Sequence, residues 1–176
     1  MKKRALIISI LLHSLLLITA YVFQGVIFPF VRVNGLVPLL LPITATGVAL
    51  YRGRYAGGIV GLFAGVLCDI SFNQPAGTFT VLLTFIGLFI GALADAYILR
   101  GFVTYYISVG AVLVVVAIVQ VFPLIADSQL EIPAYALIAT AIQQTIYSLI
   151  FAFPMWFLVR AMTKRVEQSL PSGRTA

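Results

Sequence analysis

Charge is scarce in this sequence of 176 residues. Only 9% of the residues are charged and 62% are hydrophobic, whereas a typical soluble domain has about 25% charged and about 45–50% apolar residues. A folded sphere of this size could not bury so much apolar surface, so the composition excludes a soluble globular protein. The single cysteine, Cys68, excludes a disulfide scaffold. We therefore expect a membrane protein with one integral domain, residues 1–176.

Acidic residues are the scarcest of the charged residues. There are five of them against eleven lysines and arginines, which gives a formal net charge of +6. A basic protein often binds nucleic acid, but that function needs cations clustered on one folded face. Here the cations stand singly or in short groups between apolar runs. We interpret the positive excess as a signal of membrane topology and expect no nucleic-acid partner.

Long apolar runs predict an all-α membrane protein. A helix rises 1.5 Å per residue, so about 20 apolar residues cross a hydrocarbon core roughly 30 Å thick. Six runs are expected to form a bundle of transmembrane helices: residues 5–23, 36–51, 55–72, 78–99, 102–122 and 133–159. The second run is short and contains Pro38 and Pro42, so five spans remain the alternative if it does not cross.

The basic residues predict the orientation of these spans. With six spans and a cytoplasmic N-terminus, ten of the eleven basic residues lie inside and only Arg32 lies outside. Lysine and arginine accumulate on the cytoplasmic side, so both termini are predicted to be cytoplasmic, with residues 160–176 as a basic tail. The cations that we assign to topology and lipid headgroups are Lys2, Lys3, Arg4, Arg52, Arg54, Arg100, Arg160, Lys164 and Arg165.

Glycines recur every four residues in two consecutive runs, and each series ends in an aspartate. The first series is Gly57, Gly61, Gly65 and Asp69, and the second is Gly87, Gly91 and Asp95. Residues four apart share a helix face, so each helix should present a glycine strip for close helix packing or for a partner. Segments 61–69 and 87–95 match at six of nine positions, either through duplication of a hairpin half or by chance.

The two aspartates are costly in a membrane, at roughly 2.5–3.5 kcal/mol for a charge at a helix centre. Asp95 is expected near the cytoplasmic face, in an ion pair with Arg100, Arg52 or Arg54. Asp69 should lie toward the outer side. We expect it either to serve function or interface specificity, or to reach the outer headgroups.

Other polar residues point to structure rather than chemistry. A short polar turn ends at Gly77 and should force runs 55–72 and 78–99 into an antiparallel hairpin. Gln143 and Gln144 are expected to form hydrogen bonds across helices. His13 is interpreted as an interior histidine, because no second metal ligand accompanies it. We expect no catalytic residues, no metal site and no cofactor.

The middle of the chain resembles the MreD family, the small membrane subunit of the bacterial rod-shape complex. The resemblance is carried by Pro38 or Pro42, residues 52–54, the glycines of the first series, Asp69 and Gly77. The run 153–160, followed by Lys164 and Arg165, is similar to the family's last helix and basic tail.

The resemblance implies a non-catalytic scaffold of the elongation complex (elongasome) in the bacterial cytoplasmic membrane, which supports lateral peptidoglycan synthesis. The partners it implies are an MreC-like protein first, then RodA, a class B penicillin-binding protein and, directly or through other subunits, the MreB filament. Membrane lipids and a homo-oligomer are further candidates. The family is similar in shape to the substrate-binding subunits of energy-coupling-factor transporters, so a vitamin-type transporter subunit is the alternative function. A membrane enzyme is a third reading, but no clustered polar groups support it.

Overall fold

The computed structural model describes residues 13, 15–31, 36–72, 77–97, 101–126 and 133–169. An N-terminal helix (residues 15–22) leads into a π-helical turn and a short 3₁₀ helix. The elements that follow along the chain are η1 (Phe23–Ile27), η2 (Phe28–Val31), α2 (Leu40–Arg52), α3 (Arg54–Phe72), α4 (Thr78–Tyr97), α5 (Phe102–Ala126) and α6 (Ala134–Ser169). The predicted all-α class is confirmed for the described residues.

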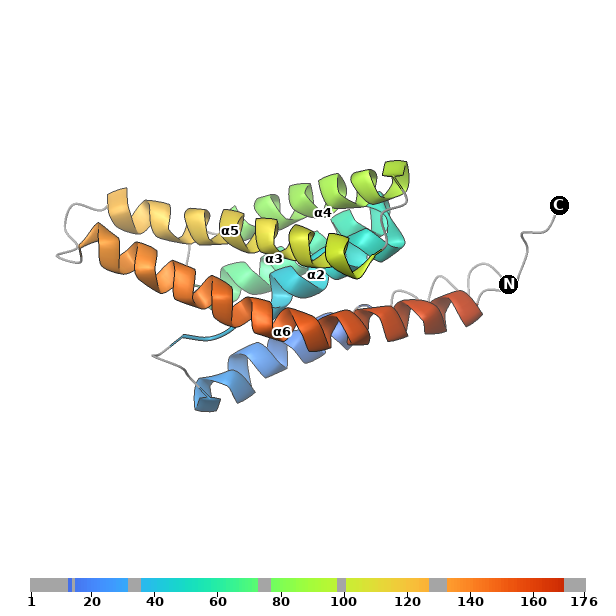
Figure 1. Cartoon of the computed structure of the whole chain (residues 1–176), viewed down its shortest axis with the longest axis horizontal. Helices are drawn as coiled ribbons and strands as arrows, with labels where there is room; N and C mark the ends of the chain where they lie inside the picture. Colours follow the sequence, from blue (N-terminus) through green and yellow to red (C-terminus); the bar gives the residue numbers. More distant parts are fainter. Residues whose placement is uncertain are drawn as a thin grey trace.

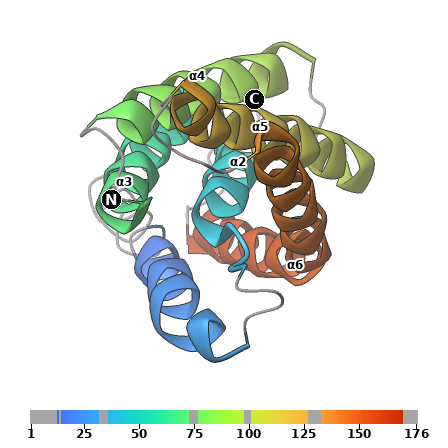
Figure 2. The same cartoon turned by 90° about the vertical axis from the view of Figure 1, so that its left-hand side faces the viewer.

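Helix α2 forms the centre of the molecule. Every residue from Leu40 to Leu50 is buried, and Figure 2 shows the other helices arranged around it. Its thirteen residues extend only about 20 Å at 1.5 Å per residue. The helix begins at Leu40 rather than near residue 36, because Leu39 has a non-helical backbone with φ −87° and ψ 78°.

Four helices among the described residues are long and apolar enough to cross a membrane. The stretches are Arg54–Ser71 in α3, Thr78–Tyr97 in α4, Phe102–Ile125 in α5 and Tyr135–Thr163 in α6. The stretch Leu15–Val26 is apolar but shorter. The six-span bundle therefore stays a prediction, because the N-terminal part of the first run lies outside the described residues and α2 is short.

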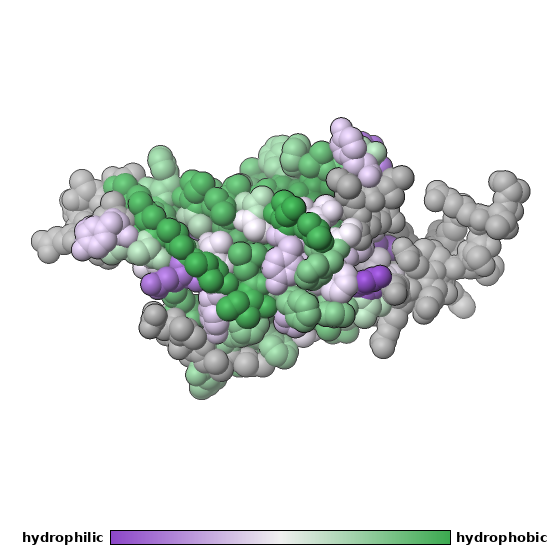
Figure 3. Space-filling model, viewed as in Figure 1, coloured by the Kyte–Doolittle hydropathy of each residue, from purple (hydrophilic) through white to green (hydrophobic). Residues whose placement is uncertain are grey.

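The helices differ in how much of their surface the chain itself covers. In the membrane-crossing stretch, 39% of the α3 residues and 33% of the α4 residues are buried, but only 22% in α5 and 11% in α6. Figure 3 shows a mainly hydrophobic surface on the face that it draws, which suits contact with lipid tails. Helices α5 and α6 therefore offer the most uncovered apolar surface.

Helix α6 is longer than its apolar run predicts. It continues as one helix through Ser169, beyond the expected end of the span at residue 159, and Figure 1 shows its end extending past the helices beside it. Pro154 lies inside it, and α5 likewise contains Pro123 and continues to Ala126.

Several predicted topology residues lie outside the described part of the chain. These are Lys2, Lys3, Arg4, Arg32, Arg100 and, for their side chains, Lys164 and Arg165.

Candidate functional site

The predicted glycine strips lie against each other where α3 packs on α4. A Cβ atom added at Gly57 would overlap the carbonyl oxygen of Gly87, and one added at Gly87 would overlap the carbonyl oxygen of Gly57. The two backbones are thus in direct contact at this crossing. No other residue type leaves room for that approach.

The contact continues along both helices. A Cβ atom at Gly61 would overlap the Leu83 carbonyl, and one at Gly65 would overlap the backbone of Phe79 and Thr80. Toward the other end, a Cβ atom at Gly91 would meet the backbone of Arg54. All five glycines of the two series are therefore used to pack the hairpin inside the chain.

Asp69 caps the beginning of α4. Its Oδ1 accepts a hydrogen bond from the Phe79 N–H at 2.8 Å, and its Oδ2 accepts from the N–H groups of Gly77 at 3.0 Å and Thr80 at 3.1 Å. The Thr80 hydroxyl donates a further bond at 2.5 Å. The first N–H groups of a helix have no partner within it, and the positive end of its dipole favours a carboxylate. Asp69 therefore stabilises the start of α4.

Asp95 lies in the matching place at the beginning of α3. Its Oδ2 accepts a hydrogen bond from the Arg54 N–H at 3.0 Å, and its carboxylate lies so close to Gly53 that a Cβ there would overlap it. Gly53 has a φ of +82°, which favours glycine. The backbone before α3 is thus shaped around the Asp95 carboxylate.

Arg54 does not form the predicted ion pair with Asp95. The Arg54 guanidinium donates to the Tyr55 hydroxyl at 2.7 Å and stacks over the Tyr55 ring at 4.6 Å. Arg52 ends α2 and has an interaction of its own, and Arg100 lies outside the described residues, so an ion pair of Asp95 with either of them stays a prediction. The Asp95 carboxylate accepts from the backbone N–H of Arg54 at the helix start, a directional donor that requires no long side chain to be ordered.

The hairpin has an approximate internal two-fold symmetry. Adding 26 to the last three residue numbers of the first series gives the second series, so Gly61, Gly65 and Asp69 map onto Gly87, Gly91 and Asp95. The contacts follow the same rule: the Thr80 N–H that binds Asp69 corresponds to the Arg54 N–H that binds Asp95. The sequence match between segments 61–69 and 87–95 therefore coincides with equivalent packing.

A second polar cluster surrounds the beginning of α2, and the sequence predicted only part of it. The side-chain oxygen of Gln24, from η1, accepts bonds from the N–H groups of Leu40 at 2.9 Å and Leu41 at 3.2 Å. From α6, Ser148 accepts from the Leu39 N–H at 2.9 Å. Gln144 of α6 donates to the carbonyl of Val37, in the non-helical segment just before α2, at 3.1 Å. The sequence missed Gln24 and Ser148, because a lone amide or hydroxyl in an apolar run gives no local signal of its partner.

Aromatic side chains join the other ends of α2, α5 and α6. Trp156 donates its ring N–H to the Tyr51 hydroxyl at 2.7 Å and packs edge-on against Phe102, with ring centroids 5.1 Å apart. The Arg160 guanidinium stacks over Trp156 at 4.9 Å. This position suits a residue at the headgroup boundary, where aromatic and cationic side chains gather.

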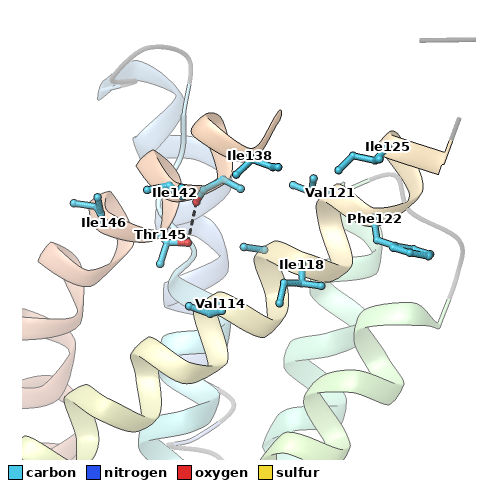
Figure 4. Close-up of a pocket in the computed structure, with 11 residues that line it drawn as sticks. Val114, Ile118, Val121, Phe122, Ile125, Ile138, Ile142, Thr145 and Ile146 are labelled. Carbon is cyan, nitrogen blue, oxygen red and sulfur yellow. Dashed lines mark hydrogen bonds between the residues drawn. The ribbon is translucent and has the colours of Figure 1, made fainter. Parts of the chain in front are cut away.

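An apolar groove separates α5 and α6 at their other ends. Its volume is about 450 Å³, and Figure 4 shows Ile118 and Phe122 on α5 with Ile138 and Ile142 on α6. The Thr145 hydroxyl in the lining donates to the Ala141 carbonyl of its own helix at 2.8 Å. The groove therefore offers hydrocarbon contacts and hardly any polar recognition.

The described residues contain no group of three His, Cys, Asp or Glu side chains that could hold a metal ion. His13 is buried and has an interaction of its own. Cys68 is a buried free thiol. The arrangement as a whole supports packing and helix capping.

Comparison with known proteins gives one family. The family model for rod shape-determining protein MreD matches residues 3–166. Searches of curated proteins and of solved structures returned no match.

Proposed function

Because the chain belongs to the MreD family of rod shape-determining proteins, we propose that it is a non-catalytic membrane subunit of the bacterial elongation complex. In this role it supports lateral peptidoglycan synthesis by binding partner membrane proteins, first among them an MreC-like protein. RodA, a class B penicillin-binding protein and the MreB filament are further proposed partners, in contact with the chain directly or through other subunits.

The observation that carries this proposal is the family match over residues 3–166, and the character of the site supports it. Gln24, Asp69, Asp95 and Gln144 are engaged in caps and interhelical bonds, whereas the buried Tyr105 hydroxyl has no hydrogen-bond partner in the described part of the chain. A subunit that acts by binding needs a rigid bundle with uncovered outer faces, and α5 and α6 have such faces.

The proposed topology has six membrane-embedded helical segments in the cytoplasmic membrane, with both termini on the cytoplasmic side. Four of the helices are long and apolar enough to cross, and the basic residues favour this orientation. The chain can be truncated at a chosen residue and fused to a reporter enzyme that is active on only one side of the membrane. Truncations after residues 32, 76 and 130 should activate a reporter that works only outside the cytoplasm, and truncations after residues 53, 100 and 170 one that works only inside. Reversed activity at any of these positions would contradict the topology.

The glycines and aspartates of the hairpin are proposed to serve partner binding indirectly. Gly57, Gly61, Gly65, Gly87 and Gly91 face the opposite helix of the same chain, so a partner would contact other surfaces of the assembled bundle. The least covered surfaces, on α5 and α6, are the first candidates.

The transporter-subunit alternative receives no support from the two cavities described. The α5–α6 groove is apolar, and the cavity between the N-terminal helix and α6 is lined by residues such as Phe28, Phe151 and Met155. A vitamin-type ligand needs several placed polar groups for recognition, and these linings present almost none.

Deletion of the gene in a rod-shaped host tests the proposal. Cells without the protein should become wide and round, and expression of the wild-type chain should restore rods. An affinity tag on the chain should co-purify the MreC-like protein from detergent-solubilised membranes. Normal rods after deletion, or loss of vitamin uptake with normal shape, would contradict the proposed function.

A further inference from the structure

An amide side chain of α6 faces outward within the membrane-crossing stretch. Gln143 is exposed and lies eight residues after Tyr135, where that stretch begins. Eight residues correspond to about 12 Å of helix, so the amide lies about two turns inside this apolar stretch. Side chains here face either lipid tails or another protein.

The predicted bond across helices is wrong for Gln143 within the described part of the chain: its amide has no hydrogen bond there, although its neighbours do. Gln144 donates to the Val37 carbonyl, and the hydroxyls of Thr140 and Thr145 bind carbonyls of their own helix at 2.8 Å. Lipid tails can neither donate nor accept a hydrogen bond. An outward-facing amide at this depth is therefore satisfied by a polar group on another helix.

The residues around Gln143 permit close approach of such a helix. The Gln143 face consists of Ala139, Thr140, Gln143, Ile146 and Ile150, all exposed. Ala139 lies one turn before the amide and the small Thr140 beside it. Small residues next to a polar one are typical of helix interfaces in membranes.

We propose that a second copy of this chain covers the Gln143 face, with the two Gln143 amides bonded to each other across a two-fold axis. Copies inserted in the same orientation are related by an axis along the membrane normal, so their Gln143 side chains lie at the same depth. An amide is both donor and acceptor, and it is therefore complementary to itself. This proposal does not rest on the shape-determining function.

Self-association of the purified full-length chain in lipid vesicles tests the proposal. Wild-type chains carrying donor or acceptor dyes at the C-terminus should show energy transfer that falls reversibly as lipid is added. Gln143→Leu should raise the dimer dissociation constant about tenfold. Gln143→Asn keeps an amide and should stay within about threefold of wild type.

A matched pair of alanine substitutions checks that the effect belongs to this face. Ala139→Ile adds bulk beside Gln143 and should weaken the dimer, whereas Ala111→Ile, at an exposed alanine of α5, should leave it unchanged. A wild-type chain that stays monomeric at the lowest lipid dilution would overturn the proposal. Equal association of Gln143→Leu and wild type would also overturn it, as would association that appears only when a different membrane protein is added.

Discussion

Four hydrogen-bond donors converge on the Asp69 carboxylate, and three of them are backbone N–H groups at the start of α4. Asp95 likewise accepts a hydrogen bond from the Arg54 N–H at the start of α3. The sequence places both aspartates at opposite ends of an antiparallel hairpin, but it cannot identify their donors. Those donors belong to a different helix, and no sequence spacing shows that the carboxylate reaches them.

Removal of the Asp69 carboxylate should destabilise the fold more than removal of the single hydroxyl that binds it. Asp69→Ala leaves the N–H groups of Gly77, Phe79 and Thr80 without this acceptor and should cost about 2 kcal/mol. Thr80→Val removes one donor and should cost about 1 kcal/mol. Unfolding in mixed detergent micelles measures both. Equal stability of Asp69→Ala and wild type would show that the cap contributes nothing.

Substitutions at Gly53 and Gly77 together test the placement of Asp95. Both have positive φ, +82° and +98°, but a Cβ at Gly53 would overlap the Asp95 carboxylate, whereas a Cβ at Gly77 meets nothing within 4 Å. Gly77→Ala should lose about 1–2 kcal/mol from backbone strain alone, and Gly53→Ala about 3 kcal/mol because overlap is added. The same micelle unfolding assay compares them, and a larger loss at Gly77 would contradict the placement of Asp95.

Among the elements, the α3–α4 pair is held by backbone contact and α2 by side chains from both ends of the chain. The hairpin could be predicted, because a short polar turn and glycines at helical spacing are local signals. The central, capped position of α2 could not be predicted from the sequence. Its start is capped by Gln24 and Ser148, which are far apart in sequence, and its apolar run looks like that of any lipid-facing helix.

The helix contact predicts opposite effects for two glycine-to-alanine changes. At Gly87 the added methyl group would overlap the Gly57 carbonyl, whereas at Gly110, within α5, nothing lies within 4 Å. Gly87→Ala should therefore destabilise the protein by about 1–3 kcal/mol. Gly110→Ala should stabilise it by up to about 1 kcal/mol, because alanine favours the helix. Thermal unfolding in detergent distinguishes them, and a shift of the same sign for both would exclude the backbone contact.

The start of α2 gives another prediction. Gln24→Leu removes the acceptor of two buried N–H groups, those of Leu40 and Leu41, and should cost about 2–3 kcal/mol. Ser148→Ala removes the acceptor of one, the Leu39 N–H, and should cost about 1 kcal/mol. Hydrogen exchange at these amides, followed by mass spectrometry, should accelerate in each variant. Unchanged exchange after Gln24→Leu would contradict the cap.

For the whole molecule, the apolar composition predicts a membrane protein but does not separate core from surface. In a soluble protein the polar residues mark the outside, whereas here both Leu41 in the core and Phe85 on the surface are apolar. The central place of α2 and the uncovered faces of α5 and α6 are therefore visible only in the structure. The family assignment adds the role in rod shape determination.

The central claim is that a bundle held together by the α3–α4 hairpin determines cell shape by binding, so shape must depend on the hairpin. The most direct test replaces the chromosomal gene with Gly61→Leu/Gly65→Leu, with Gly110→Leu as the control, and measures cell width at equal protein level. The double variant should give round cells that no longer co-purify the MreC-like protein, while the control stays rod-shaped. Rods of normal width with the double variant would contradict the account.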